Sequence, residues 1–278
     1  MSWVSSQTLA PQPAPPARQR RWTGARIAGH LLMALWIVAG ANLLYYLASN
    51  VMSDFFRDYW QKYLDGIIIT LQLVGLSMVA GAALSLPVAL ARASRNPFIS
   101  GIAYAYVYFF RGTPLLAQAF LIYYGAGTFR PFFSDIGLWW FFRDAWYCAV
   151  FAFTLNTAAY QAEILRGAVQ NVDKGQWEAA AALGLRKGIT FWKVILPQAM
   201  IVALRPYGNE LVLMIKGSAI VSLVTIFDLM GETRRAYSRT FDFQAYIWAA
   251  VLYLIVVEAL RRLWDEIELR LTRHLRRN

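Results

Sequence analysis

The sequence has few charged residues for its length. Only 15% of its 278 residues are Asp, Glu, Lys or Arg, whereas roughly a quarter of an ordinary soluble domain is charged. Hydrophobic residues make up 58%, and they gather in long apolar stretches of the kind that cross a bilayer. The shortage of charge excludes an ordinary soluble domain and predicts an all-α integral membrane protein.

Cysteine and histidine are also scarce. The single cysteine, Cys148, excludes an intrachain disulfide, and His30 and His274 are the only histidines, which is too few for a Cys/His metal site. A membrane-embedded enzyme would need a nucleophile with its base, or metal ligands, so this class has little support. The motif G-x-x-x-x-G-K-[ST] is missing as well, so we do not expect this chain to bind ATP in the P-loop manner.

Long apolar stretches are what the sequence does have. A membrane-spanning helix needs about 20 mostly apolar residues. The net charge of +11 does not indicate nucleic-acid binding, because the basic residues lie in the short segments that flank these stretches. The predicted spans are 27–49, 64–91, 100–126, 145–166, 204–225 and 243–264.

The charges of the connecting segments predict the orientation of the spans. Segments 1–26, 92–98, 167–196 and 265–278 carry an excess of Lys and Arg, and the three segments between them are balanced. This alternation follows the positive-inside rule, so we expect six spans with both termini in the cytoplasm, a disordered basic tail over 1–26 and a second basic tail over 265–278. In the balanced segment 226–242, Arg234, Arg235 and Arg239 offset Asp228, Glu232 and Asp242.

Aromatic residues recur at helical spacing in the segment before the second span. Phe55, Phe56, Tyr59, Trp60 and Tyr63 lie opposite charged residues. This pattern predicts a short amphipathic helix that lies in the outer membrane interface.

The longest basic segment contains a short helix with strong end signals. Asp173 is a favourable N-cap, and Gln176 three residues later can complete a capping box. Four alanines, Ala179 to Ala182, favour helix with almost no side-chain bulk, and Gly184 suits a left-handed stop. Such a smooth helix can enter a groove on another protein, although an ordinary loop helix has the same pattern.

The motifs around this helix resemble a known family. Glu178-Ala179-Ala180, Gly184 and Val194-Ile195-Leu196-Pro197 resemble the EAA signature of ABC importer permeases, with Val194 as a conservative departure. Further motifs over residues 60–265 are similar to those of polar amino acid permeases, most of all those that import histidine, lysine, arginine, ornithine or opines. These motifs are 111–115, 155–160, Glu163-Ile164, 167–169, Asn209-Glu210 and 249–255.

The resemblance implies a division of labour between subunits. It implies a type I ABC importer transmembrane domain over 60–265, a five-span core to which 27–49 adds an N-terminal span. The coupling loop, 171–197, would dock in a cleft of a separate ATPase dimer that binds ATP and Mg, so this chain needs no cofactor and is no enzyme. A second permease subunit (a copy or a paralogue), an external amino-acid-binding protein, an amino acid substrate and the bacterial inner membrane complete the system. The implied ATPase-coupling residues are Asp173, Gln176, Glu178, Ala179, Ala180, Gly184, Leu196 and Pro197.

Ionisable residues within the spans are the candidates for substrate contact, because each costs about 2.5–3.5 kcal/mol to insert. Arg111 lies beside Gly112 and Pro114, which weaken the third span, and transporters place substrate sites at such breaks. Pro206 and Gly208 predict a comparable break beside Glu210 in the fifth span. The predicted substrate pathway comprises Arg111, Gly112, Thr113, Pro114, Gln118, Asn156, Thr157, Tyr160, Asn209 and Glu210.

Structural roles compete with this interpretation. Arg111 and Glu210 can also form a structural ion pair between two helices, and Asn and Thr also serve as ordinary hydrogen-bond partners between helices. Glu163 and Arg166, near the end of the fourth span, are expected to be a structural pair. A self-sufficient secondary transporter or channel is the alternative function, but it leaves the EAA segment unexplained.

The orientation can be tested by cysteine labelling in a Cys148→Ser background. A membrane-impermeant maleimide added to intact cells should label cysteines at Ser134 and Ser238 but not at Ser94 or Lys187, because the last two lie in positive segments. Labelling of Lys187→Cys from outside would overturn the orientation.

Overall fold

A computed structural model describes residues 23–50 and 53–273, so most of the predicted tail 1–26 and the last residues, including His274, lie outside the described part. The chain divides into two units, 1–57 and 58–278. In the first unit, α1 (Gly24–Asn50) has no buried residue. Its exposed side chains include Trp36 and Tyr45, as expected of a helix whose whole surface suits lipid.

The described residues are helical apart from turns and short connections. Three helical stretches, Gly24–Asn50, Asp54–Arg92 and Lys187–Val224, are long and apolar enough to cross a membrane. The helices after α1 are α2 (Asp54–Arg92), α3 (Pro97–Gly112), α4 (Leu115–Thr128), α5 (Arg130–Asp135), α6 (Trp139–Phe142), α7 (Ala145–Gln170), α8 (Lys174–Ala182), α9 (Lys187–Thr190), the π-helix η1 (Phe191–Ile195), α10 (Leu196–Ser218), the 3-10 helix η2 (Ala219–Val224), α11 (Leu229–Thr240) and α12 (Gln244–Thr272).

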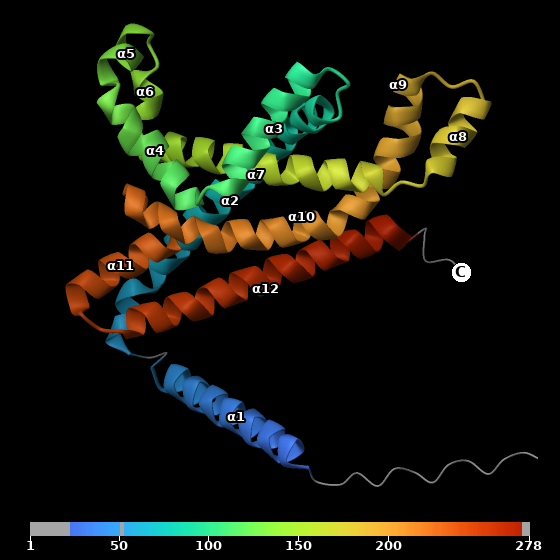
Figure 1. Ribbon diagram of the computed structural model, residues 1–278. Coiled ribbons are helices and arrows are strands. Elements are labelled where there is room, and N and C mark those ends of the chain that lie inside the picture. The colour runs from blue at the N-terminus through green and yellow to red at the C-terminus, as the bar shows by residue number, and fades with distance from the viewer. Residues whose placement is uncertain (1–22, 51–52, 274–278) are drawn as a thin grey trace, which may run out of the picture. The chain divides into compact units, whose positions relative to one another are not determined.

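Helix α7 is the centre of the second unit. It packs against α3, α4 and α10. In Figure 1, α3 and α4 run obliquely to α7, and α10 runs alongside it. Its buried face consists largely of alanine, and small residues let helix backbones approach closely where no water competes for the interface. Phe153 of α7 fills the core together with Leu73 of α2 and Ile215 of α10.

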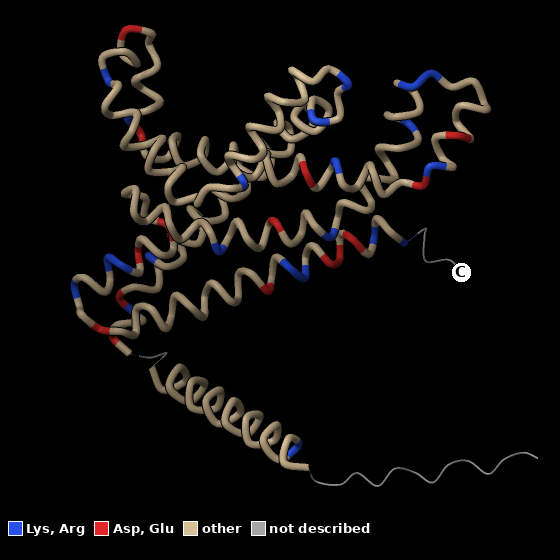
Figure 2. The backbone as a smooth tube through the Cα atoms, in the orientation of Figure 1, with Lys and Arg blue, Asp and Glu red and all other residues tan. Residues whose placement is uncertain are grey.

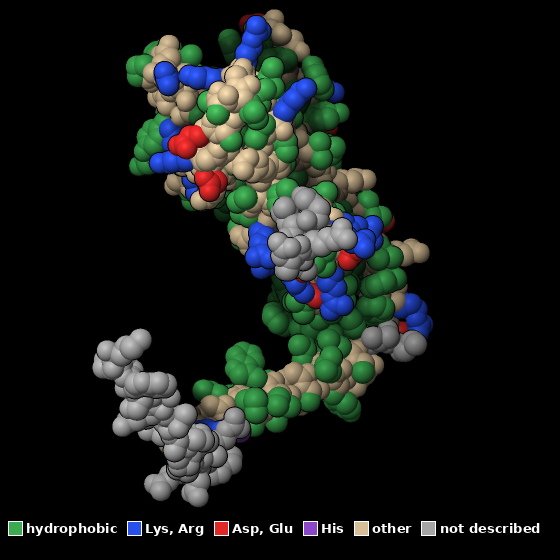
Figure 3. Space-filling view, turned by 90° about the vertical axis from the view of Figure 1, so that its right-hand side faces the viewer, with side chains coloured by type: hydrophobic (Ala, Val, Ile, Leu, Met, Phe, Trp, Pro, Cys, Tyr) green, Lys and Arg blue, Asp and Glu red, His purple; other side chains and the backbone are tan. Residues whose placement is uncertain are grey.

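The loops and short helices gather at two ends of this unit. Helices α5, α6 and α11 lie at one end, and α8, α9 and the C-terminal part of α12 lie at the other (Figure 1). Charged residues are concentrated toward the helix ends (Figure 2). Figure 3 faces the α8–α9 end and shows many Lys and Arg side chains there with few Asp and Glu.

The third predicted span is broken where the sequence predicted. Helix α3 ends at Gly112, Thr113 is extended with φ −113° and ψ 148°, and α4 starts after Pro114. The break follows from Pro114, which disfavours helical geometry at the residue before it.

The predicted break in the fifth span is wrong. Helix α10 continues from Leu196 to Ser218 through Pro206, and the irregular turns lie at its ends, in η1 and η2. Gly208 serves close packing instead, since a Cβ atom there would overlap the indole of Trp264 on α12.

The predicted interfacial helix before the second span is also wrong. Its residues belong to the long helix α2. Tyr63 is 1% exposed and its hydroxyl donates to the Ala245 carbonyl at 3.0 Å. This part of the aromatic face therefore packs against the start of α12 rather than against lipid.

The predicted pair of Glu163 and Arg166 is confirmed and is part of a larger group. Arg166 Nη2 lies 2.7 Å from Glu163 Oε2, and Arg92 Nε lies 3.2 Å from Glu163 Oε1. One carboxylate thus links the ends of α2 and α7.

Two glycines of α2 give a matched test of its packing. A Cβ atom at Gly66 would lie 2.8 Å from the Leu229 Cα, whereas at Gly75 nothing lies within 4 Å. Gly66→Ala should destabilise the protein by about 1–3 kcal/mol, because backbone cannot move aside as a side chain can. Gly75→Ala should be neutral or stabilising, since Ala favours helix. Thermal unfolding in detergent measures both, and equal melting temperatures would contradict the packing of α2 on α11.

Candidate functional site

The break between α3 and α4 leaves backbone carbonyls without helical partners. In a continuous helix, the Phe110 carbonyl would accept from the amide of residue 114. That residue is Pro114, which has no N–H. A carbonyl left unpaired in an apolar environment costs several kcal/mol, so side chains are needed here.

Two buried amides satisfy this break. Gln118 Nε2 donates to the Phe110 carbonyl at 2.9 Å and to the Thr113 carbonyl at 3.1 Å. Asn156 Nδ2 of α7 donates to the Phe110 carbonyl at 3.0 Å and to Gln118 Oε1 at 2.9 Å. Gln118 and Asn156, both predicted as pathway residues, therefore stabilise the non-helical backbone at this break.

The next residue of α7 reaches the candidate carboxylate. Thr157 Oγ1 donates to Glu210 Oε1 at 3.0 Å, and Gln161 Nε2 donates to Thr157 Oγ1 at 3.0 Å. Glu210 is only 5% exposed. A chain of hydrogen bonds therefore runs from α7 to a carboxylate buried on α10.

Arg111 lies at the end of α3 and remains exposed. Its guanidinium carbon is 5.2 Å from the ring centroid of Tyr160, and the Tyr160 hydroxyl donates to the Arg111 carbonyl at 3.4 Å. Among the residues that the structure describes, the ion pairs do not include Arg111 with Glu210. The structure thus shows no direct contact that would support a structural ion pair of Arg111 and Glu210. The Arg111 guanidinium instead lies over the Tyr160 ring.

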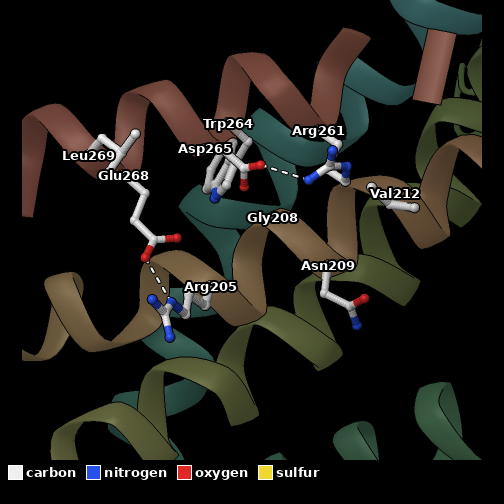
Figure 4. Close-up of a pocket in the computed structure, with 9 residues that line it drawn as sticks. All are labelled: Arg205, Gly208, Asn209, Val212, Arg261, Trp264, Asp265, Glu268 and Leu269. Carbon is white, nitrogen blue, oxygen red and sulfur yellow. Dashed lines mark hydrogen bonds and ion pairs between the residues drawn. The ribbon is translucent and has the colours of Figure 1, made fainter. Parts of the chain in front are cut away.

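Asn209 is separated from Glu210 by the turn of the helix. It is exposed and lines a groove of about 610 Å³ between α10 and α12. Figure 4 shows Glu268 of α12 reaching Arg205 of α10, with Asp265 and Arg261 further along α12. The structure thus divides the predicted pathway residues between a buried network and this open groove.

The groove between α10 and α12 was not predicted from the sequence. Arg205 Nε lies 2.7 Å from Glu268 Oε1, and Arg261 Nη1 lies 2.8 Å from Asp265 Oδ2 (Figure 4). The spacing of four between Arg205 and Asn209, and between Arg261 and Asp265, was the available signal for one polar face on each helix. Both signs of charge line the groove, and they form ion pairs with one another.

Helix α8 has the end structures that the sequence predicted, with one exception. Asp173 Oδ1 accepts the Gly175 amide at 2.7 Å, and Gly184 has a φ of +70°. The Leu185 amide donates to the Ala180 carbonyl at 3.0 Å, which completes a Schellman stop. The predicted capping box is wrong, because Gln176 Oε1 accepts instead from Gln198 Nε2 at 3.2 Å.

The exposed face of α8 carries most of the EAA signature. Ala180 is 3% exposed, whereas Glu178 and Ala179 are exposed. The helix packs on η1, which leads directly into α10. Leu196 and Pro197 open α10 directly after η1, and the Leu196 amide donates to the Phe191 carbonyl.

Comparisons with known proteins agree with this arrangement. Residues 81–267 match the family described as binding-protein-dependent transport system inner membrane component. The chain is 43% identical over 220 residues to the nopaline transport system permease protein NocM of Agrobacterium fabrum, which covers 79% of this chain and 91% of the relative. It is 39% identical over 202 residues to the arginine ABC transporter permease protein ArtM of Haemophilus influenzae, with coverages of 72% and 88%.

A solved structure shares the fold. The crystal structure of an amino acid ABC transporter with histidines has a TM-score of 0.68 and 35% identity, covering 77% of this chain and 95% of that chain. The family match spans more than half of the sequence, and its description assigns the inner membrane. The chain therefore belongs to the family of inner membrane components of binding-protein-dependent transport systems, and it is a multi-pass, non-catalytic permease subunit of an ABC importer.

Proposed function

We propose that the imported substrates are basic amino acids or opines. The names of the similar permeases support this class, since one is a nopaline permease and another an arginine permease. The solved structure with 35% identity is described as that of an amino acid ABC transporter with histidines. A buried carboxylate, Glu210, also suits a substrate that carries a cationic group.

The proposed membrane arrangement has six spans and cytoplasmic termini. The core is 60–265, and α1 adds the N-terminal span 27–49, which precedes the family match over 81–267. In this arrangement the tails 1–26 and 265–278, and the coupling loop 171–197, lie inside. The Lys and Arg side chains at the α8–α9 end support this orientation (Figure 3).

Helix α8 is the proposed contact with an ATPase dimer that binds ATP and Mg. The observation that carries this role is a helix exposed along the EAA face, fixed at both ends and joined through η1 to α10. Motion of the ATPase would pass from α8 into α10, the helix that bears Glu210. A second permease subunit and an external binding protein complete the proposed assembly.

The proposed substrate pathway runs past Glu210, Thr157 and Arg111. In this proposal the exposed head group of Arg111 meets the substrate carboxylate near the α3–α4 break, and Glu210 receives the cationic group. Residues at the break and their hydrogen-bond partners shape this part of the proposed pathway: Gly112, Thr113, Pro114, Gln118, Asn156 and Tyr160. Asn209 contributes through the groove between α10 and α12.

The function is tested by purifying the chain with its ATPase and binding protein in liposomes. Basic amino acids should stimulate ATP hydrolysis and enter the liposomes, whereas neutral amino acids of similar size should do neither. Uptake without the ATPase would instead indicate a secondary transporter.

The coupling role of α8 has a matched control in another exposed loop. Glu178→Lys and Ala179→Trp should leave insertion intact but detach the ATPase or uncouple hydrolysis from import, because both alter the proposed docking face. Arg95→Trp, in the segment 92–98, should retain both. Pull-down of the ATPase and uptake assays measure the effects, and normal import by both α8 variants would contradict the coupling role.

The role of Glu210 is tested with Arg111→Gln, Glu210→Gln and the double variant. Glu210→Gln should weaken transport by roughly 1.5–3 kcal/mol, about ten- to a hundredfold, as expected for a hydrogen bond to a charged group. The protein level should hold, since Gln can still accept from Thr157. Glu266→Gln, in an exposed pair with Arg270 on α12, is the control for charge loss.

The double variant separates the two roles of this residue pair. If Arg111 and Glu210 neutralise each other, single changes lower the protein level and the double variant restores both level and uptake. Because the structure describes no direct contact between them, we expect uptake to stay low in the double variant. Recovery of level and uptake together would make the pair structural.

A further inference from the structure

Segment 226–242 is balanced in charge by sequence, but the fold exposes its two signs unequally. Asp228 is 0% exposed and Glu232 8%, whereas Arg234 and Arg239 are exposed and the Arg235 side chain is 39% exposed. Helix α11 displays these basic residues at one end of the second unit (Figure 2). The third acid, Asp242, is half-buried and its Oδ1 accepts the Gln244 amide at 2.9 Å. The exposed charge of this segment is therefore mostly basic although its composition is neutral.

Both carboxylate oxygens of Asp228 accept hydrogen bonds inside the protein. Its Oδ1 accepts the Gly231 amide at 2.8 Å and caps α11, and its Oδ2 accepts the Tyr253 hydroxyl at 3.2 Å. Burial raises the pKa of the Asp228 carboxyl to about 6, against the opposing effect of the Gly231 amide. This carboxylate is thus poorly placed to offset the arginines at the surface.

The arginines line a concave surface. Arg235 lies with its guanidinium carbon 5.2 Å from the Phe227 ring centroid and Nη1 3.6 Å from Glu232 Oε1. Arg234 Nη1 donates to the Ser222 carbonyl at 3.3 Å. A guanidinium has five N–H donors, so these contacts hold the head groups in place while leaving donors for a partner. The groove has a volume of about 510 Å³ and includes Tyr237 and Tyr246.

We propose that this groove, together with Arg239, is the docking site for acidic side chains of the external binding protein. The inference rests on the proposed function, which places segment 226–242 outside. A partner of opposite charge is attracted to such a surface and oriented by it before close contact. Tyr and Arg are enriched in protein–protein interfaces, and the description of the matched family names a binding protein on which these transport systems depend.

The test uses the permease with its ATPase in nanodiscs of uncharged lipid. The probe is the amino-acid-binding protein from the same organism that stimulates ATP hydrolysis by the wild-type complex. Binding kinetics are measured at low and high salt for the double variant Arg234→Glu/Arg239→Glu, for Arg234→Lys/Arg239→Lys, and for Arg130→Glu. Arg130 is an exposed arginine of segment 127–144 and serves as the matched control.

The charge-reversed variant should associate at least about tenfold more slowly at low salt, with a smaller difference at high salt. The Lys variant and Arg130→Glu should bind nearly as the wild type does, and basal ATP hydrolysis should be unchanged in all three. Equal association rates for the wild type and the reversed variant would overturn the docking site while leaving the proposed function intact.

Other results also exclude the proposal. The same kinetics are also measured in nanodiscs of anionic lipid, and a defect that occurs only there would assign the arginines to lipid head groups. An equal defect in Arg130→Glu would make the effect a general one of charge on this face. If no binding protein stimulates the wild-type complex, the proposed function itself fails, which the wild type alone reveals.

Discussion

The packing of α3, α4 and α7 depends on the need of every backbone carbonyl in apolar surroundings for a hydrogen-bond donor. Pro114 removes the amide that would bond the Phe110 carbonyl, and the break between α3 and α4 persists only because side chains replace that amide. Gln118 supplies one donor from α4 and Asn156 supplies another from α7. A single missing N–H thus fixes the position of three helices relative to one another.

The same constraint places the functional groups. Once Asn156 is held at the break, the neighbouring Thr157 faces α10 and donates to Glu210. Helix α10 continues back through η1 to the packed helix α8. The helix that bears the buried carboxylate is therefore continuous with η1, on which α8 packs with its EAA face exposed, although more than thirty residues of sequence separate Glu210 from Glu178.

Several local features could be predicted because their causes are local. The break at Pro114, the Asp173 cap and the left-handed Gly184 each follow from the chemistry of one residue and its neighbours. The break expected at Pro206 is absent because Gly208 admits the Trp264 indole and α10 stays packed on α12. The capping box expected at Gln176 gives way to Gln198, twenty-two residues further along the chain.

The sequence by itself determined the membrane class, the family, the break at Pro114 and the two ends of α8, because these features follow from composition and from short motifs. Only the tertiary structure decided which polar groups meet. Gln118 and Asn156 donate hydrogen bonds at the α3–α4 break. Glu210 is buried on α10, whereas its neighbour Asn209 is exposed. Asp228 and Glu232 are buried, whereas Arg234 and Arg239 are exposed. The physical reason is that the burial and pairing of a side chain depend on the neighbours that packing brings together. A count of charges along the chain does not show which of them are buried.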